Sequence, residues 1–370
     1  MQFYIAPMFT LCISSILRDN PMDFARDKLR AASTDWEKSI WSFMADWFNP
    51  KVKTIRVKTS GSTGKPKTIL HKKEFMRKSA QLTFAALGLS KAHTALLCLP
   101  TNKISGMMMV VRAFEKEMIL ESVAPSVNPL LKLDERTKID FAAFTPMQFS
   151  KVVSSKKAYV KAEKIKTVIL GGEGISDELL ATITRMKNNV YATFGMTETI
   201  SHIALKKLNG KNPDKYFSVL PSVRVSVNKE NCLVVKAPKL GVKNLVTNDV
   251  VKIISPTQFE WLGRIDNVIN SGGLKIHPEE VEAILLRKID IPFFIGGIKD
   301  AITGEKPCLV LERKRLSKNT LKELKGILLS LDKKSCPKEI WLVPDFAKTE
   351  NGKLKRKETL ALPAKKISLV

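Results

Sequence analysis

A run of glycines, small hydroxyl residues and lysines lies near position 60. It reads Lys58-Thr59-Ser60-Gly61-Ser62-Thr63-Gly64-Lys65-Pro66-Lys67. Glycine lets backbone N–H groups turn toward an anion, the hydroxyls add donors, and Lys65 and Lys67 add positive charge. It is not a Walker A loop, because Pro66 stands where that loop needs serine or threonine. The run predicts a phosphate-binding loop, with a flexible surface turn as the alternative.

A glycine pair follows an apolar run that is typical of a buried strand. Gly171, Gly172 and Glu173 come directly after Leu170. The two glycines permit close approach of the backbone to a flat ligand at the carboxyl end of a strand. A tight turn between a strand and a helix explains the same residues equally well.

The next candidate combines an aromatic ring, a hydroxyl and a carboxylate at another strand end. The stretch reads Tyr191-Ala192-Thr193-Phe194-Gly195-Met196-Thr197-Glu198-Thr199. Phe194 can stack on a base, Thr197 can donate to a phosphate, and Glu198 can hold Mg²⁺, which prefers carboxylate oxygens. The alternative is a strand end with a helix cap at Thr197.

Two further segments supply a carboxylate and two basic side chains. Asp249 can accept from ribose hydroxyls, and Arg264 adds a donor; a surface salt bridge is the alternative for each. Near the carboxyl end, Asn351-Gly352 makes a turn that presents Lys353. Taken alone, that turn is typical of an exposed hairpin in a lysine-rich tail.

The surrounding pattern indicates the elements that must hold these residues. Helical spacing of apolar residues covers 22–48 and 73–87, and strands and helices then alternate up to residue 194, which predicts an α/β fold with parallel strands. From Val223 onward, short strands separated by turns predict an antiparallel or barrel-like piece. A new α+β unit follows Asp266. We therefore expect a large domain over residues 1–265 and a small one over residues 266–370.

The order and spacing of these five segments resemble the superfamily of acyl-CoA synthetases, peptide-synthetase adenylation domains and beetle luciferases. The resemblance covers Thr54 to Arg356. It implies ATP, Mg²⁺ and coenzyme A, and a small carboxylic acid as the molecule that is activated. The implied roles fall into five groups: phosphates for Thr59–Lys67; adenine and ribose for Gly171, Gly172, Glu173, Thr193, Phe194, Gly195, Asp249 and Arg264; catalysis for Thr197, Glu198 and Lys353; a hinge at Asp266; and a coenzyme A tunnel at Gly272 and Gly273.

Two stretches, 194–203 and 261–278, look closest to the o-succinylbenzoate–CoA ligases of menaquinone synthesis. The substrate pocket implied on this basis contains Lys103, Arg112, Thr145 and His202. An exposed charge is the alternative for Lys103 and Arg112, and Met107 to Val111 are expected to form a core helix. Another aryl or fatty acid, or a carrier-protein thiol as acceptor, stays open.

The sequence departs from the family pattern in three places. Only 58 residues precede the phosphate run where the family usually has well over a hundred, so an N-terminal subdomain is expected to be reduced. The usual Thr-Gly-Asp is Thr247-Asn248-Asp249, which keeps the carboxylate. Ala347 replaces the proline often found before the lysine-bearing tail. None of these changes removes a proposed reacting group.

Composition narrows the class of protein further. The chain has 370 residues, a net charge of +26 and five cysteines without metal or disulfide spacing, which fits the cytoplasm. Its lysines are dispersed and its aromatics do not alternate with them, so nucleic acid is a remote alternative. No apolar run is long enough to span a bilayer, and Pro7 interrupts the apolar start, against a signal peptide. A homo-oligomer stays open.

Overall fold

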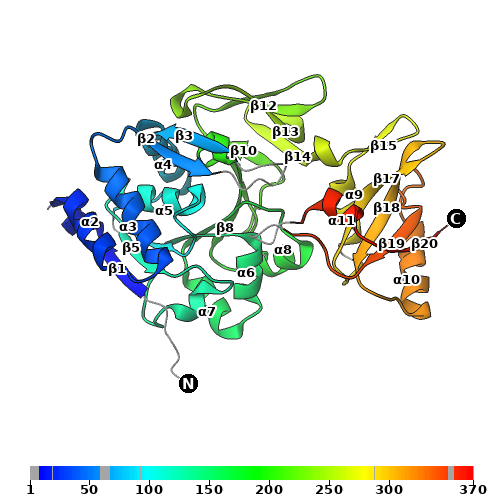
Figure 1. The fold of residues 1–370 in the computed structure, drawn as a ribbon, viewed down its shortest axis with the longest axis horizontal. Coiled ribbons are helices and arrows are strands. Elements are labelled where there is room, and N and C mark those ends of the chain that lie inside the picture. Colours follow the sequence, from blue (N-terminus) through cyan, green and yellow to red (C-terminus); the bar gives the residue numbers. More distant parts are fainter. Residues whose placement is uncertain are drawn as a thin grey trace.

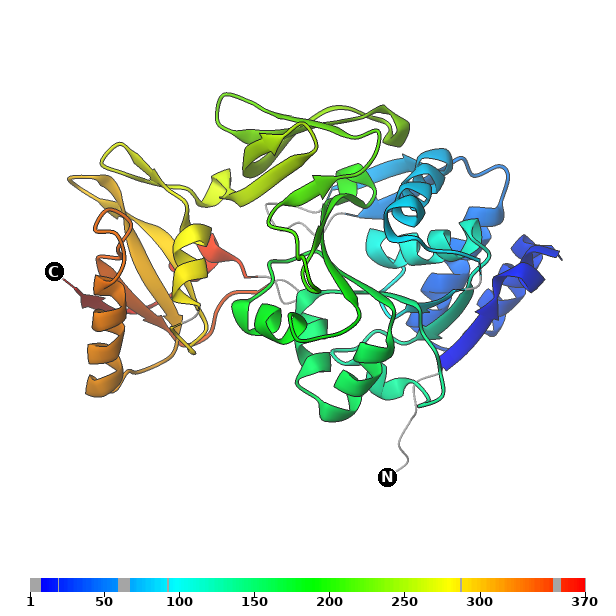
Figure 2. The same cartoon turned by 180° about the vertical axis from the view of Figure 1, so that it is seen from behind.

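The computed structural model describes residues 8–18, 20–58, 67–91, 93–286, 288–348 and 354–369. Figures 1 and 2 show a large lobe built on a long sheet and a smaller lobe formed by the residues after Asp266. The predicted phosphate-loop residues Thr59 to Lys65 and the predicted catalytic Lys353 lie outside the described residues.

One twelve-stranded sheet runs through the large lobe. Its strands in chain order are β1 Met8–Cys12, β4 Thr94–Leu97, β5 Ile119–Val123, β6 Phe141–Phe144, β7 Thr167–Leu170, β8 Asn189–Gly195, β9 His202–Lys207, β10 Phe217–Val219, β11 Arg224–Val227, β12 Cys232–Ala237, β13 Val242–Ser255 and β14 Gln258–Arg264. Their spatial order is β1-β5-β4-β6-β7-β8-β9-β10-β14-β13-β12-β11.

The sheet changes character between β8 and β9. Strands β5, β4, β6, β7 and β8 pair in parallel, whereas β9 pairs with β8 in antiparallel fashion. The antiparallel strands predicted beyond Val223 continue this same sheet. The parallel-rich α/β class is therefore confirmed, and the change of direction falls at the segment that carries Thr197 and Glu198.

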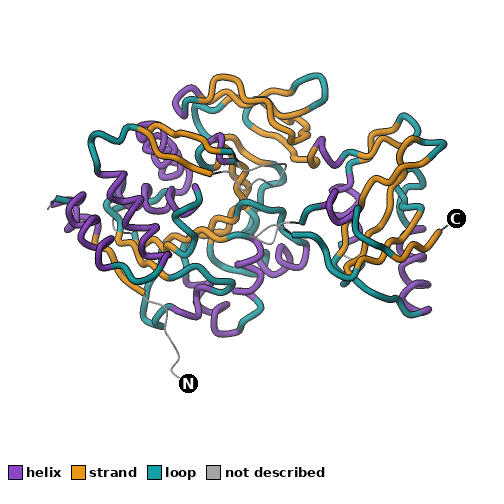
Figure 3. The backbone as a smooth tube through the Cα atoms, viewed as in Figure 1, coloured by secondary structure: helices purple, strands orange, loops and turns teal. Residues whose placement is uncertain are grey.

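Helices cover both faces of the parallel part, as Figure 3 shows. They are α1 Ile13–Arg18, α2 Pro21–Ala31, α3 Asp35–Phe48, α4 Lys73–Leu87, α5 Ile104–Glu115, α6 Pro146–Val153, α7 Lys156–Lys164 and α8 Asp177–Ile183. Side chains alternate across a strand. Phe141 and Ala143 of β6 accordingly join the core under α3, α4 and α5, and Ala142 and Phe144 join the core under α6 to α8.

The single helix predicted over residues 22–48 is two helices in the structure. Helix α2 ends at Ala31, and α3 begins at Asp35 behind an N-terminal cap. The Thr34 hydroxyl accepts from the Glu37 N–H, and the Glu37 carboxylate accepts from the Thr34 N–H. The capping pair therefore explains the break that apolar periodicity alone did not reveal.

Three 3₁₀ turns and a short hairpin complete the large lobe. The turns are η1 Pro129–Lys132, η2 Thr197–Thr199 and η3 Pro238–Leu240, and the hairpin pairs β2 Thr54–Lys58 with β3 Thr68–Lys72. Among the residues that the structure describes, no helix combines the length and apolarity needed to cross a bilayer.

A second, six-stranded sheet forms the smaller lobe, which follows the turn η4 Ile265–Asn267. Its elements are β15 Ile269–Ser271, β16 Leu274–Ile276, α9 Pro278–Leu285, β17 Phe293–Asp300, β18 Gly304–Glu312, α10 Lys318–Leu329, β19 Glu339–Val343, α11 Arg356–Leu360 and β20 Lys365–Ser368. A partly buried ion pair between Arg356 and Glu282, with Nη2 donating to Oε2 at 2.7 Å, ties α11 to α9.

Candidate active site

The turn between β8 and β9 is held rigidly by its own residues. The buried Thr199 hydroxyl contacts the carbonyl oxygens of Met196 at 3.0 Å and Ser201 at 2.8 Å. A Cβ atom at Gly195 would lie 2.4 Å from the Ser201 carbonyl oxygen, so only glycine fits there. Thr197 is half-buried and Glu198 is exposed, so both predicted catalytic side chains stand on a fixed support.

Strand β3 links the predicted phosphate loop to this turn. Lys67 lies directly before β3, and His71 near its end lies beside the turn, where the Thr197 backbone and the Glu198 carboxylate act on its ring. Burial lowers the pKa of His71, and those two groups oppose the shift. The ring is 6% exposed, and its Nε2 atom has no hydrogen-bond partner among the described residues. Apart from the histidine itself, no feature of the sequence predicts this placement.

The Glu198 carboxylate is suited to a magnesium ion whose other ligands are mostly waters and substrate phosphates. No group of three or more histidine, cysteine or acidic side chains that could hold a metal occurs in the described part of the chain. Mg²⁺ commonly binds through one or two protein carboxylates together with waters and substrate phosphates. An exposed carboxylate on a stiff turn meets that requirement, whereas a closed protein cage does not form here.

The residues predicted to bind adenine line the adjoining strand ends. The Thr193 hydroxyl donates to the Leu170 carbonyl oxygen at 3.0 Å and lies against Gly171. The Phe194 ring packs edge-to-face against Phe217 and Phe259, with centroids 5.8 and 5.1 Å away. Glycine 172 and Glu173 continue the loop after β7. The strand ends therefore place Gly171 beside Thr193, the residue directly before Phe194, although Thr193 follows Gly171 by 22 positions in the sequence.

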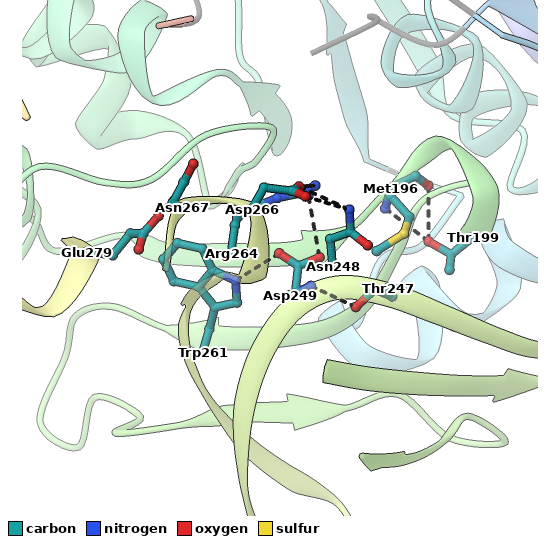
Figure 4. A network of polar contacts seen from close by, with 10 residues as sticks. All are labelled: Met196, Thr199, Thr247, Asn248, Asp249, Trp261, Arg264, Asp266, Asn267 and Glu279. Carbon is teal, nitrogen blue, oxygen red and sulfur yellow. Dashed lines mark hydrogen bonds and ion pairs between the residues drawn. The ribbon is translucent and has the colours of Figure 1, made fainter. Parts of the chain in front are cut away.

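A network of charged and polar side chains spans β13, β14 and η4 (Figure 4). We call it the Asp266 cluster, which comprises Asn248, Asp249, Trp261, Arg264 and Asp266. The Asp249 carboxylate accepts from Trp261 Nε1 at 3.0 Å, and Arg264 Nη1 lies 3.8 Å from its other oxygen. Burial raises the pKa of Asp249, against the Trp261 hydrogen bond and the Arg264 charge. The two residues predicted to bind ribose are therefore neighbours, and their strands are in register at this pair.

The predicted hinge residue belongs to the same cluster. Arg264 Nη2 donates to Asp266 Oδ2 at 3.0 Å, and Asn248 Nδ2 contacts both oxygens of that carboxylate at 3.0 and 3.3 Å. These contacts lower the pKa of Asp266, although burial opposes them. Asn248 stands where the family pattern has glycine, so this bond depends on the departure noted in the sequence.

A second polar cluster lies inside the large lobe. We call it the Arg112 cluster, which comprises Thr83 of α4, Arg112 of α5, and Ser201 and His202 at the start of β9. Arg112 is 2% exposed, so the exposed-charge alternative is wrong. Its Nη2 donates to Ser201 Oγ at 2.6 Å and its Nε to Thr83 Oγ1 at 3.3 Å. Burial lowers the pKa of Arg112 to about 10, which keeps it charged at neutral pH.

No carboxylate faces Arg112 among the described residues: its hydrogen-bond partners there are two hydroxyl oxygens and the Met109 sulfur at 3.7 Å. Burying a cation without an ionic partner is unfavourable. Thr83 was not singled out in the sequence, and Ser201 was noted only as part of the stretch 194–203. A threonine on the buried face of an amphipathic helix such as α4 is a weak signal, and its role becomes visible only once α5 is packed beside it.

The other predicted pocket residues have different positions. The Thr145 hydroxyl accepts from the Gln148 N–H at 3.1 Å and so caps α6. Lys103 is half-buried at the N-terminal cap of α5. Met107, Met108 and Met109 are buried, which confirms the predicted core helix. Of the four pocket residues, Arg112 and His202 therefore belong to one cluster, while Thr145 is engaged in a helix cap.

Gly272 and Gly273 form the turn between β15 and β16. Both have positive φ, 55° and 80°, a conformation that glycine adopts without strain. The Gly272 N–H donates to the Thr303 carbonyl oxygen at 2.9 Å. Lys348 and Leu354, which flank the segment that contains Lys353, pair as an isolated bridge.

Comparison with known proteins agrees with this arrangement. Residues 57–239 match the family model described as AMP-binding enzyme. A 2-succinylbenzoate–CoA ligase of a Geobacillus species is 27% identical, over 80% of this chain and 66% of its own length. A Lactococcus lactis protein of the same name is 25% identical, over 86% of this chain and 72% of its own length. The chain thus spans just under two thirds of the Geobacillus relative.

Solved structures show the same fold. An acyl-CoA synthetase (AMP-forming)/AMP-acid ligase II-like protein from Dyadobacter fermentans is 30% identical, covers 96% of this chain and 99% of its own, and superposes with a TM-score of 0.64. An o-succinylbenzoate CoA synthetase from Bacillus subtilis, solved with its acyl-adenylate intermediate, is 21% identical, covers 84% and 70%, and has a TM-score of 0.69.

Proposed function

This chain belongs to the family of AMP-binding enzymes, and from that premise we propose that it joins 2-succinylbenzoate to coenzyme A at the expense of ATP. The observation that carries the choice of acid is Arg112, a buried cation whose described partners are all uncharged. A diacid keeps one carboxylate for Arg112 while the other reacts. A simple fatty acid leaves the buried charge uncompensated. The names of the curated relatives support the same acid.

Two successive bond exchanges make up the proposed reaction. First, a carboxylate oxygen of the acid forms a bond with the α-phosphorus of ATP, and the bond from that phosphorus to pyrophosphate breaks. The coenzyme A sulfur then bonds to the acyl carbon, AMP leaves with the bonding pair, and the thiol proton passes to solvent. The nucleophile of the first step is already an anion, so no histidine base is required.

Negative charge concentrates on phosphate oxygens in the first step, so the chain must supply donors and cations there. In the proposed arrangement Thr197 donates to the α-phosphate, the segment from Thr59 to Lys67 binds the β- and γ-phosphates, and Lys353 bridges carboxylate and α-phosphate. Glu198 would hold Mg²⁺, and the ion would neutralise charge at the phosphates. The fixed turn between β8 and β9 favours this step, because its donors need not reorganise.

We further propose that residues 1–265 and 266–370 act as two domains that rotate about Asp266. Lys353 then serves the first step, and Gly272 and Gly273 line the path of the coenzyme A arm in the second. The separate sheet that follows Asp266 supports this division. Lys353→Ala is expected to stop acyl-adenylate formation yet convert supplied acyl-adenylate to thioester, and Gly272→Leu is expected to do the reverse. Equal loss in both steps for folded Lys353→Ala would contradict the alternation.

The proposed acid is tested by a panel of carboxylic acids with ATP, Mg²⁺ and coenzyme A. Pyrophosphate release and AMP formation are measured for 2-succinylbenzoate, benzoate, octanoate and each monoacid that lacks one of the two carboxylates. The expected result is the highest kcat/KM for 2-succinylbenzoate. A higher value for octanoate or benzoate would exclude the proposed acid while leaving the family assignment intact.

A further inference from the structure

The hydrogen bonds of the Arg112 cluster form a closed ring with a defined direction. The Thr83 hydroxyl donates to the Ser79 carbonyl oxygen at 3.2 Å, so its own oxygen accepts from Arg112 Nε. His202 Nε2 lies 3.3 Å from the same oxygen and therefore must donate to it. On the other side, His202 Nδ1 lies 3.4 Å from Ser201 Oγ, which accepts from Arg112 Nη2 at 2.6 Å.

This direction fixes the form of the imidazole. With Nε2 as the donor, Nδ1 is left to accept the Ser201 hydroxyl proton, so His202 is neutral and protonated on Nε2. A proton on Nδ1 would take away the acceptor for Ser201 and place a second cation beside Arg112. Burial and the Arg112 charge both lower the pKa of His202 well below its usual range, in agreement with the hydrogen-bond pattern.

The closed ring of hydrogen bonds also determines which N–H groups of Arg112 remain available to a ligand. Of its five N–H groups, Nε–H, one on Nη1 and one on Nη2 contact Thr83, Met109 and Ser201. One N–H on each terminal nitrogen has no partner among the described residues. Two parallel N–H groups match the two oxygens of a carboxylate, and the geometry is useful only if the guanidinium plane is held still.

We propose that Thr83 and neutral His202 are positioning residues, which orient Arg112 without neutralising it so that a substrate carboxylate is its only ionic partner. This rests on the proposed function, since Arg112 then binds the carboxylate of 2-succinylbenzoate that does not react. Hydroxyl and imidazole are suited to the task because they satisfy donors but carry no negative charge. An aspartate or glutamate in either place would pair with Arg112 and compete with the substrate.

The first test compares 2-succinylbenzoate with 4-oxo-4-phenylbutanoate and 2-butanoylbenzoate, which each lack one of its carboxylates. Thr83→Val keeps the shape but removes the acceptor for Arg112, and it is expected to lower the preference for the diacid about 10-fold, mostly through KM for the acid. Thr83→Ser restores the hydroxyl and is expected to restore the preference. Thr182→Val is the matched control, because Thr182 makes the same helix-internal bond, at 3.1 Å to the Glu178 carbonyl oxygen, on α8, which packs in the other core cluster of the large lobe.

A double variant separates positioning from a general loss of structure. If Thr83 acts through Arg112, adding Thr83→Val to Arg112→Met changes the preference no further. Additive losses, or an equal KM change for ATP and for all three acids, would overturn the inference. A folded Thr83→Val that keeps the diacid preference would overturn it as well, while the proposed acid stands.

The second test does not depend on Thr83→Val being folded. His202→Glu places a carboxylate beside Arg112, and it is expected to keep or raise the unfolding temperature while abolishing the preference for the diacid. Retention of the preference by His202→Glu would overturn the inference. If the wild-type enzyme shows no preference for the diacid over both monoacids, the proposed acid and this inference fall together.

Discussion

The arginines of the two polar clusters differ in burial and in the charge of their partners. In the Asp266 cluster, Arg264 faces two carboxylates, lies near solvent and joins neighbouring strands and the turn after them. In the Arg112 cluster, the cation is buried, and its neutral hydroxyl partners lie 29 residues before it and 89 residues after it in the chain. An ion pair near water exchanges partners at little cost, whereas a buried charge without an ionic partner is costly to the folded protein and favours a ligand that compensates it. The contrast indicates a cluster suited to movement and a cluster suited to recognition.

The largest expected effect comes from removing the buried charge. Arg112→Met is expected to lower kcat/KM for 2-succinylbenzoate about 10²-fold or more, because the buried charge that is proposed to pair with the substrate is lost. The free energy of unfolding is expected to stay level or rise, since an uncompensated buried cation disappears. Arg112→Lys keeps the charge but lacks the planar guanidinium. Its kcat/KM is expected to lie between those of the wild-type enzyme and Arg112→Met. A strongly destabilised Arg112→Met would show instead that the arginine is structural.

Next in size is a change in the compensated cluster. Asp249→Asn is expected to raise KM for ATP about 10-fold, because an amide makes a weaker hydrogen bond to a ribose hydroxyl than a carboxylate does. The KM for 2-succinylbenzoate is expected to change far less. Steady-state kinetics with each substrate varied in turn separates the two. An equal rise in both constants would mean that the clusters do not serve different substrates.

A third prediction concerns the stability of the protein at acidic pH. His202 is neutral in the folded protein but protonates near pH 6.5 in the unfolded chain, and its folded pKa is lowered. Below that pH the unfolded state binds more protons, so the free energy of unfolding falls by up to about 1.4 kcal/mol for each pH unit. His202→Gln is expected to remove this part of the acid loss. Urea unfolding at pH 7.5 and pH 5.0 measures it, and equal acid losses in both proteins would place the proton elsewhere.

The smallest expected effect concerns the bond from Asn248 to Asp266. Both groups are near solvent, so the bond is worth about 1 kcal/mol or less. Asn248→Gly restores the family pattern and is expected to speed amide exchange at Asp266, Asn267 and Val268 two- to fivefold, without altering the preference among acids. Hydrogen exchange by mass spectrometry reads this directly. A changed preference among the acids would mean that the two clusters do not act independently.

Local signals account for much of the fold that the sequence predicted. Strands Phe141–Phe144 and Thr167–Leu170 belong to the alternation of strands and helices predicted up to residue 194, because short apolar runs between polar turns have few alternatives. The helix predicted over 73–87 is α4. Strand β9 was missed, since its lysines and histidine interrupt the apolar pattern, and its place is set by pairing with β8.

The candidate site likewise contains residues that local sequence signals predicted and contacts that they did not. Asp249 and Arg264 were predicted because they lie in recognisable segments, and their proximity follows from strand register. The partners of Arg112 were not predicted, because Thr83 lies 29 residues before it and Ser201 lies 89 residues after it. Contacts between helix faces and strand ends depend on packing that no local pattern encodes. The roles of Thr59 to Lys65 and of Lys353 stay predictions, since they lie outside the described residues.

The turn between β8 and β9 constrains how such an enzyme could acquire a new substrate. Glu198, which is proposed to hold the metal, and Ser201 and His202, which face Arg112, lie within five consecutive residues on one hydrogen-bonded turn. A substitution there that alters acid recognition also risks shifting the chemistry shared by every substrate. Helices α4 and α5 contribute residues to the Arg112 cluster but none of the residues proposed to bind Mg²⁺ or the phosphates. Divergence toward other acids should therefore accumulate at positions such as Thr83 and Arg112, while the turn changes slowly, and directed evolution of specificity has its widest freedom on those two helices.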